Sequence, residues 1–269
     1  MRTELRNAKR IVVKIGTTSL TYSNGTINFK KLENLARVLT DLRNSGREIV
    51  LVSSGAVGAG MSRLGLKEKP VELKEKQATA AVGQALMMQF YQKFFNEYNQ
   101  TIAQLLLTKD VITDKIKRRN VENTLSTLLE MGVIPIANEN DSVATDELEG
   151  SKIGDNDTLS SMTAILVKAD ALLMLSDIDG LYDSSPVDNP DAKLISFVDK
   201  IDKELYSIAG DSSSIVGTGG MYTKIRAAEH LMKEGIHTVI ASGEDVKIIY
   251  DILAGNEIGT FFSTKGKDE

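Results

Sequence analysis

The chain has 269 residues, with 32 lysines and arginines against 37 aspartates and glutamates, and therefore a formal net charge of -5. This acidic balance argues against a nucleic-acid binder, whose binding surface is basic. The sequence contains no cysteine, which excludes disulfides, thiol catalysis and cysteine-ligated metal centres. It also has neither a signal peptide nor an apolar stretch of about 20 residues, so we expect a cytoplasmic protein without a membrane span.

Short β-branched runs alternate along the chain with longer stretches of helical periodicity. Most of these runs are apolar throughout, as in a parallel sheet that helices cover on both faces. The pattern predicts an α/β fold with one open, mainly parallel twisted sheet sandwiched between helices. The expected strands are Arg10–Ile15, Glu48–Ser53, Thr101–Leu107, Val133–Ala137, Ala171–Ser176 and His237–Ala241. The expected helices are residues 32–42, Lys76–Tyr98, Arg118–Met131, Asp157–Lys168 and Gly220–Lys233.

The sequence shows no linker between domains, so we expect a single domain over residues 1–269 with a core from about residue 10 to about residue 255. The turn-rich stretch Leu181–Asp191 is expected to form a flap or hairpin, and Phe262–Glu269 a polar tail. In open α/β sheets, ligands bind beyond the carboxyl ends of the strands. Polar residues that follow the predicted strands are therefore the candidates for a functional site.

Two motifs follow the first two strands. Lys14 precedes a turn with one glycine and three hydroxyls, residues 16–19, and can meet a phosphate there; alternatively, it is an ordinary lysine at a strand end. Residues 53–60 contain two serines and three glycines before a helix, which makes an anion cradle or a site of close helix packing. Their spacing fits neither the dinucleotide fingerprint nor the P-loop.

Two clusters of acidic and amide residues, 138–141 and 154–157, lie in predicted loops. Such clusters can bind an ammonium group, position lysines or hold magnesium. Asparagine and aspartate also form turns and helix caps, which is the simpler interpretation of either cluster alone. Two clusters close together favour a functional role.

The last candidate motifs are Ser176-Asp177 at the end of a strand and residues 217–224 at the start of a helix. The second motif holds three glycines, two threonines and Lys224, so that backbone donors and an ammonium group can meet a polyphosphate. It is not a Walker A motif, because Lys224 is followed by Ile225. Its composition is too specialised for a simple helix cap and favours function.

Together these motifs resemble the amino acid kinase family. The resemblance runs from about Arg10 to about Gly255, and the six motifs stand in the family's order. It implies an amino acid kinase fold and ATP-dependent phosphorylation of the side-chain carboxylate of L-glutamate, the first step of proline synthesis, with Mg²⁺ accompanying the nucleotide.

The resemblance also implies roles for individual residues. Lys14 and Lys224 would stabilise the transferring phosphoryl group, and Asp157 would hold the two lysines in place. L-Glutamate would bind at Ser54, Asp141 and Asn156. ATP would bind at Lys14, Ser176, Asp177, Thr218, Gly219, Gly220, Met221, Tyr222, Thr223 and Lys224.

The chemistry agrees with these roles. A glutamate side chain has a pKa of about 4.3, so at neutral pH the nucleophile is already a carboxylate and needs no general base. Catalysis then consists of positioning and charge neutralisation between two anions. Asp157 is accordingly an organiser, and Asp141 an acidic partner for the substrate ammonium. The alternatives are an aspartate or N-acetylglutamate kinase, or a non-catalytic nucleotide-binding sensor.

The resemblance extends to partners. It implies a homo-oligomer, feedback inhibition by proline and transient contact with glutamate-5-semialdehyde dehydrogenase. Many family members carry an additional C-terminal PUA domain, and this sequence ends at Glu269 without one. Oligomeric state and proline sensitivity are therefore expected to differ from those of the longer members.

Overall fold

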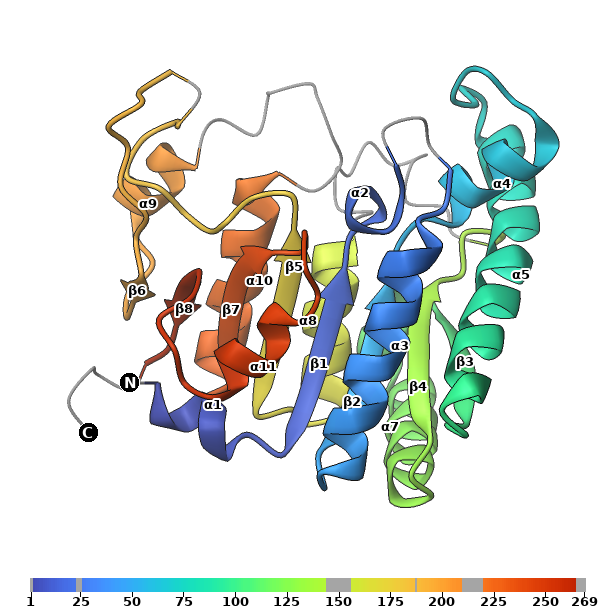
Figure 1. The fold of residues 1–269 in the computed structure, drawn as a ribbon, viewed down its shortest axis with the longest axis horizontal. Helices are drawn as coiled ribbons and strands as arrows, with labels where there is room; N and C mark the ends of the chain where they lie inside the picture. Colours follow the sequence, from blue (N-terminus) through green and yellow to red (C-terminus); the bar gives the residue numbers. More distant parts are fainter. Residues whose placement is uncertain (1, 23–25, 144–155, 187, 210–219, 265–269) are drawn as a thin grey trace.

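The computed structural model describes residues 2–22, 26–143, 156–186, 188–209 and 220–264. Its centre is an eight-stranded sheet of order β3-β4-β2-β1-β5-β7-β8-β6, in which only the β7–β8 pair is antiparallel (Figure 1). This confirms the predicted mainly parallel α/β sheet. The strands are β1 (Arg10–Ile15), β2 (Glu48–Ser53), β3 (Ile102–Leu107), β4 (Ile134–Glu139), β5 (Ala171–Ser176), β6 (Phe197–Val198), β7 (His237–Ser242) and β8 (Thr260–Phe262).

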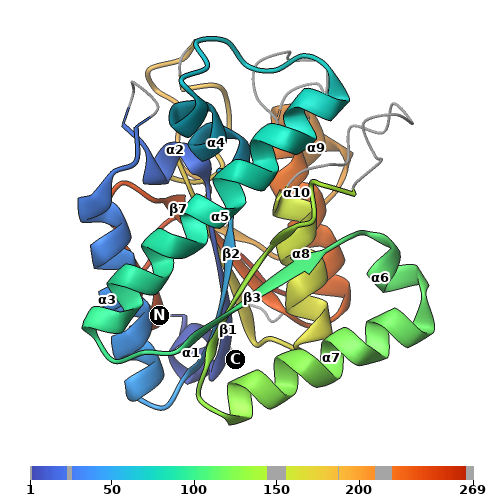
Figure 2. The ribbon, with the colours of Figure 1, turned by 90° about the vertical axis from the view of Figure 1, so that its right-hand side faces the viewer.

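Helices cover both faces of the sheet, which Figure 2 shows nearly edge-on. One layer contains α1 (Thr3–Asn7), α3 (Phe29–Asn44), α5 (Leu73–Glu97) and α11 (Ile248–Leu253). The other contains α7 (Lys115–Glu130), α8 (Asn156–Leu166) and α10 (Met221–Lys233). The remaining helices are α2 (Thr17–Leu20), α4 (Ala56–Leu64), α6 (Asp110–Thr113) and α9 (Lys203–Ile208).

The core is divided by the sheet into two apolar clusters. In β1, Ile11, Val13 and Ile15 contribute to the cluster under α3 and α5, whereas Val12 contributes to the cluster under α8 and α10. This alternation follows from the two-residue period of a strand. Lys14 shares the face of Val12 and therefore points toward α8 and α10.

The edges of the sheet differ from the sequence-based expectation. The predicted strand 101–107 is an edge strand that is only partly buried, because Gln104 and Leu106 are exposed, Leu106 to 40%. Its apolar composition therefore does not reflect burial on both faces. The expected polar tail from Phe262 is wrong at its first residues, because Phe262 ends β8 and is fully buried. A three-residue antiparallel strand is too short to give a sequence signal.

The N-terminal residues before the expected core range pack against the chain around β6 and β8. The Arg2 guanidinium donates hydrogen bonds to the carbonyl oxygens of Ser196, 2.7 Å away, and Gly259, 3.0 Å away. The same group lies over the ring of Phe261. Between β5 and β6, an antiparallel bridge between Tyr182 and Leu194 closes the predicted hairpin.

Helices α4 and α5 pack backbone to backbone at two glycines. A Cβ atom at Gly60 would lie 1.9 Å from the carbonyl oxygen of Thr79, and one at Gly83 would lie 1.7 Å from that of Ala56. Neither position accepts a side chain without displacing a helix. Close packing, one of the two interpretations of the glycines in residues 53–60, therefore explains Gly60.

Replacement of Gly83 by alanine is expected to destabilise the fold by about 1–3 kcal/mol, the usual cost of overpacking, despite the better helix propensity of alanine. The matched control is Gly58→Ala in α4, where the nearest atom would be 3.6 Å away in ordinary contact. Urea unfolding of both variants measures the difference. Equal stability of Gly83→Ala and the unaltered protein would show that the helices separate at little cost.

Among the described residues, no helix is both long and apolar enough to cross a bilayer.

Candidate active site

The strand order brings the sequence motifs together along the carboxyl ends of the strands, which form one edge of the sheet. The adjacent strands β4, β2, β1, β5 and β7 are parallel, so their carboxyl ends lie together, toward the top of Figure 1. Ile15 pairs with Ser53 on one side and with Leu175 on the other. Lys14 on β1 thus lies between the motifs that follow β2 and β4 and the motif that follows β5.

At the centre of this edge, Asp157 binds two lysines from distant parts of the chain. Lys14 Nζ lies 2.7 Å from Asp157 Oδ1, and Lys224 Nζ lies 3.1 Å from Oδ2. The side chains of Lys14, Lys224 and Asp157 are 8%, 3% and 0% exposed, respectively. Two ammonium groups around one carboxylate leave the cluster with a net positive charge, which suits an anionic ligand.

A third group holds the same carboxylate. The Thr223 hydroxyl donates to Asp157 Oδ2 at 2.8 Å and lies equally close to the carbonyl oxygen of Gly220. Thr223 belongs to the first turn of α10, and Asp157 to the first turn of α8. Two helix N-termini therefore meet at the cluster, and their partial positive charges favour anions there.

The surroundings of Asp157 keep it ionised. Burial by itself raises its pKa, because a charged carboxylate loses its hydration. The attraction of Lys14 and Lys224, with hydrogen bonds from Lys14 and Thr223, outweighs that effect and holds the pKa below its ordinary value. Asp157 is therefore a poor proton acceptor, which agrees with the organising role predicted for it.

The side of the cluster toward β5 carries the residues predicted to bind ATP. Ser176 ends β5 and donates its hydroxyl to Asp177 Oδ1 at 2.9 Å, while its carbonyl oxygen accepts from the amide of Gly243. Asp177 itself is exposed. Gly220, Met221, Tyr222 and Thr223 form the cap and first turn of α10, whereas Thr218 and Gly219 lie outside the described residues.

The side toward β2 and β4 carries the residues predicted to bind the acceptor. Ser54 follows β2 and donates its amide to the carbonyl oxygen of Ile15, and Gly55 takes φ +108° at the start of α4. Asp141 lies partly buried in the turn after β4. Asn156 begins α8, and its Oδ1 atom is buried without a hydrogen-bond partner in the described ranges. Gly154 and Asp155 lie outside those ranges.

A sequence model described as the amino acid kinase family matches residues 9–242. The chain belongs to this family. It is 50% identical over 269 residues to a protein named glutamate 5-kinase from Listeria monocytogenes, covering all of this chain and 98% of that one. It is also 50% identical to a glutamate 5-kinase from Clostridium perfringens, over 98% of this chain and 99% of the relative.

Two solved structures show the same fold at low sequence identity. UMP kinase from Bacillus anthracis has a TM-score of 0.65 and 18% identity, over 96% of this chain and 97% of that one. Carbamate kinase from Giardia lamblia bound to AMP-PNP has a TM-score of 0.66 and 16% identity, over 97% and 100% of the two chains. The amino acid kinase fold predicted from the sequence is confirmed.

Sequence reasoning did not identify two residues on α5 that hydrogen-bond to the strand ends beside the candidate site. Tyr91 and Gln84 on α5 hydrogen-bond to Ser53 and Asn138, the first at the end of β2 and the second near the end of β4. These contacts join residues 38 and 54 positions apart. A tyrosine or glutamine within a long helix gives no local signal of such a partner.

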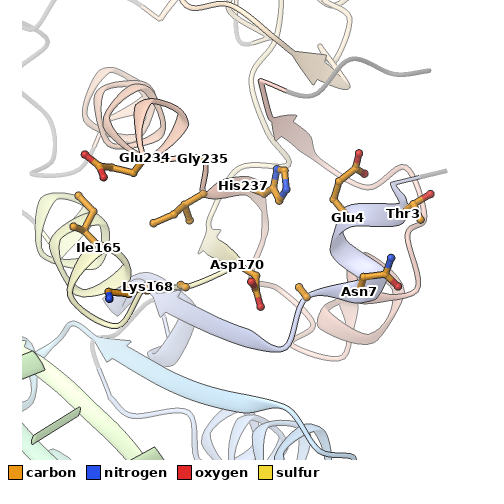
Figure 3. Close-up of a pocket in the computed structure, with 12 residues that line it drawn as sticks. Thr3, Glu4, Asn7, Ile165, Lys168, Asp170, Glu234, Gly235 and His237 are labelled. Atoms are coloured by element: carbon orange, nitrogen blue, oxygen red, sulfur yellow. The ribbon is translucent and has the colours of Figure 1, made fainter. Parts of the chain in front are cut away.

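A separate pocket of about 700 Å³ lies at the amino ends of the strands (Figure 3). It is lined by α1, the end of α8, the residues before β5 and the start of β7, and its lining includes Glu4, Asp170 and His237. None of the motifs singled out in the sequence reaches it. The candidate active site is therefore the Lys14–Asp157–Lys224 cluster and not this pocket.

Proposed function

We propose that the protein phosphorylates the side-chain carboxylate of L-glutamate with ATP, giving L-glutamyl 5-phosphate, the first step of proline synthesis. The observation that carries this proposal is the buried cluster of Lys14, Asp157 and Lys224 at the carboxyl edge of the sheet. The cluster belongs to a chain that is half identical, over its full length, to proteins named glutamate 5-kinase. The protein is accordingly a kinase of the amino acid kinase family.

The reaction needs charge compensation more than proton transfer. An oxygen of the glutamate side-chain carboxylate attacks the γ-phosphorus of ATP, and the bond to the β–γ bridging oxygen breaks to release ADP. Lys14 and Lys224 offset the negative charge that builds up as these anions approach. Because Asp157 fixes both ammonium groups before substrates bind, little reorganisation is required during the reaction.

We propose that ATP binds on the β5 side, at Ser176, Asp177 and residues 218–224, with Lys14 also reaching its phosphates. The hydroxyl of Ser176 and the carboxylate of Asp177 are hard oxygen donors, the kind of group that suits Mg²⁺. Asp177 is the one carboxylate among the proposed ATP-binding residues and would hold the Mg²⁺ that travels with ATP. When bound, that ion would neutralise phosphate charge.

We propose that L-glutamate binds on the β2 and β4 side, at Ser54, Asp141 and Asn156. Asp141 supplies an acidic partner for the α-ammonium group of glutamate. An N-acetylated acceptor has no ammonium group to pair with it. The buried Oδ1 atom of Asn156 is an acceptor that a ligand donor can satisfy. These features favour glutamate over N-acetylglutamate. The hydroxamate assay measures the choice between glutamate and aspartate.

The proposal is tested by incubating the protein with L-glutamate, MgATP and hydroxylamine, beside reactions with aspartate and N-acetylglutamate. Hydroxylamine traps an acyl phosphate as a hydroxamate, so γ-glutamyl hydroxamate with glutamate alone is the expected result. Product from another acid instead would move the acceptor assignment to an aspartate or N-acetylglutamate kinase. ATP binding without any hydroxamate would support the non-catalytic sensor.

Replacement of Asp141 by asparagine is expected to raise the KM for glutamate by about tenfold or more with little change in the KM for ATP. The physical reason is the loss of a charge-assisted contact to the substrate ammonium. The control is Asp114→Asn, an exposed aspartate that caps α7, a helix that carries none of the proposed acceptor residues. An unchanged KM for glutamate in the Asp141 variant would refute ammonium recognition there.

Three further expectations rest on the family resemblance alone, and a fourth rests on the lack of a linker in the sequence; all four stay predictions. They are feedback inhibition by proline, transient contact with glutamate-5-semialdehyde dehydrogenase, a homo-oligomer, and a single amino acid kinase domain over residues 1–269.

A further inference from the structure

One face of α5 carries two polar side chains that bind the ends of neighbouring strands. Gln84 and Tyr91 are seven residues apart, which places them on the same side of the helix two turns from each other. Tyr91 reaches β2 and Gln84 reaches β4. These two strands lead directly into the segments that contain Ser54 and Asp141.

The contact of Tyr91 continues to the backbone of Ser54. Tyr91 OH lies 2.7 Å from Ser53 Oγ, and Ser53 Oγ lies 3.2 Å from the carbonyl oxygen of Ser54. A serine hydroxyl has one hydrogen, so when it donates to that carbonyl the tyrosine must donate to the serine. The phenol thereby orients the peptide group that joins Ser54 to Gly55.

The contact of Gln84 supports the neighbouring strand. Asn138 Nδ2 donates to Gln84 Oε1 at 2.8 Å, and Asn138 is only 5% exposed. Asn138 is the penultimate residue of β4 and stands three residues before Asp141, the proposed ammonium partner. It also follows Ala137, which pairs with Val52 just before Ser53. The two supported residues therefore lie near each other on adjacent strands.

The helix that carries these contacts is itself firmly fixed. Tyr91 is fully buried, and Gly83 brings the α5 backbone against the carbonyl oxygen of Ala56 at the start of α4. The side-chain hydrogen bonds of Tyr91 and Gln84 go to Ser53 and Asn138, neither of which is assigned to substrate. Tyr91 and Gln84 therefore affect a ligand by fixing the positions of the residues that bind it.

From these contacts we propose that Tyr91 and Gln84 are positioning residues for the acceptor. They hold the strand ends that present Ser54 and Asp141, and so set the affinity for the amino acid and not that for ATP. This inference rests on the proposed function, because it assumes that the acceptor binds on the β2 and β4 side. ATP binds on the opposite side of Lys14 in that proposal, so the two KM values report separately on the two sides.

The first test compares Tyr91→Phe with Tyr98→Phe. Both variants lose one phenol oxygen from the same helix region, but Tyr98 packs against the core beyond the far end of α5. We expect Tyr91→Phe to raise the KM for glutamate about tenfold, the order expected for one buried hydrogen bond, with kcat and the KM for ATP unchanged. Tyr98→Phe should leave all three constants unchanged.

The second test compares Gln84→Met with Gln92→Met. Methionine keeps the length of glutamine without its acceptor, and Gln92 is an exposed residue whose amide donates to Asn96 on the same helix. The KM for glutamate should rise in the Gln84 variant alone. Thermal unfolding of all four variants separates positioning from folding, because a purely structural role would lower the melting temperature and leave the KM for glutamate unaltered.

The outcomes distinguish this inference from the proposed function. If the unaltered protein forms no γ-glutamyl hydroxamate, the proposed function fails. If it does, and both Tyr91→Phe and Gln84→Met keep the normal KM for glutamate, the positioning role is overturned. A rise in the KM for ATP equal to that for glutamate would also overturn it, since the effect would then extend to the whole site.

Discussion

Replacement of Lys224 by methionine is expected to lower kcat by about 100- to 1,000-fold or more, the usual loss when one electrostatic stabiliser is removed. The methionine fills similar space, so the fold should persist, and Asp157 keeps its contacts with Lys14 and Thr223. The steady-state rate of γ-glutamyl hydroxamate formation measures the effect. Circular dichroism of the same sample checks the fold.

The matched control for this variant is Lys233→Met at the other end of α10. Lys233 is exposed and pairs with Glu229 one turn away at 2.9 Å. An exposed pair of this kind contributes little to stability, so the control should retain full turnover. Retained turnover in the Lys224 variant as well would refute the role assigned to its ammonium group.

Replacement of Asp157 by asparagine is expected to reduce both turnover and stability. It leaves two buried ammonium groups beside each other without their counter-charge, and breaking a buried ion pair in this way costs about 3–5 kcal/mol. The control is Asp110→Asn, whose carboxylate pairs with Lys117 at the surface. Urea unfolding at neutral pH should separate the two variants clearly.

The stability contributed by Asp157 also has a defined pH dependence. Its pKa in the folded protein is lowered, while an unfolded aspartate titrates at about 3.9. The stabilisation is therefore present in full above that pH and is lost as the pH falls toward the folded pKa. The difference in unfolding free energy between the unaltered protein and Asp157→Asn should shrink below about pH 4. A constant difference down to pH 3 would show that ionisation of Asp157 is not the cause.

The sequence predicts the centre of the fold better than its edges. The bounds expected for β1, β2 and β5 agree with the structure, because strands buried on both faces are continuous apolar runs. At one edge, β3 is only partly buried, and near the other edge β8 has only three residues. Their place in the sheet depends on what packs against them, and a single chain segment does not encode that information locally.

The candidate site was predictable where chemistry depends on residue type and position in the fold. Lys14, Asp157 and Lys224 come from three separate motifs, and the structure brings them together. The hydroxyl of Thr223 shows the limit of such reasoning. The sequence places it among the groups around ATP, which stays a prediction, but gives no sign of its hydrogen bond to Asp157. Side-chain direction within the first turn of a helix depends on the neighbouring helix, which here is α8.

The order of the strands has a consequence for how this catalyst can change over time. Residues proposed to hold the acceptor follow β2 and β4, in the first part of the chain, whereas most of those proposed for ATP follow β5, in the last part. The central strand with Lys14 separates the two groups in space as well. Substitutions that alter which acid is accepted can therefore accumulate in the segments before β5 without disturbing how the phosphoryl donor is held. The architecture allows substrate choice to diverge while the energy source stays constant.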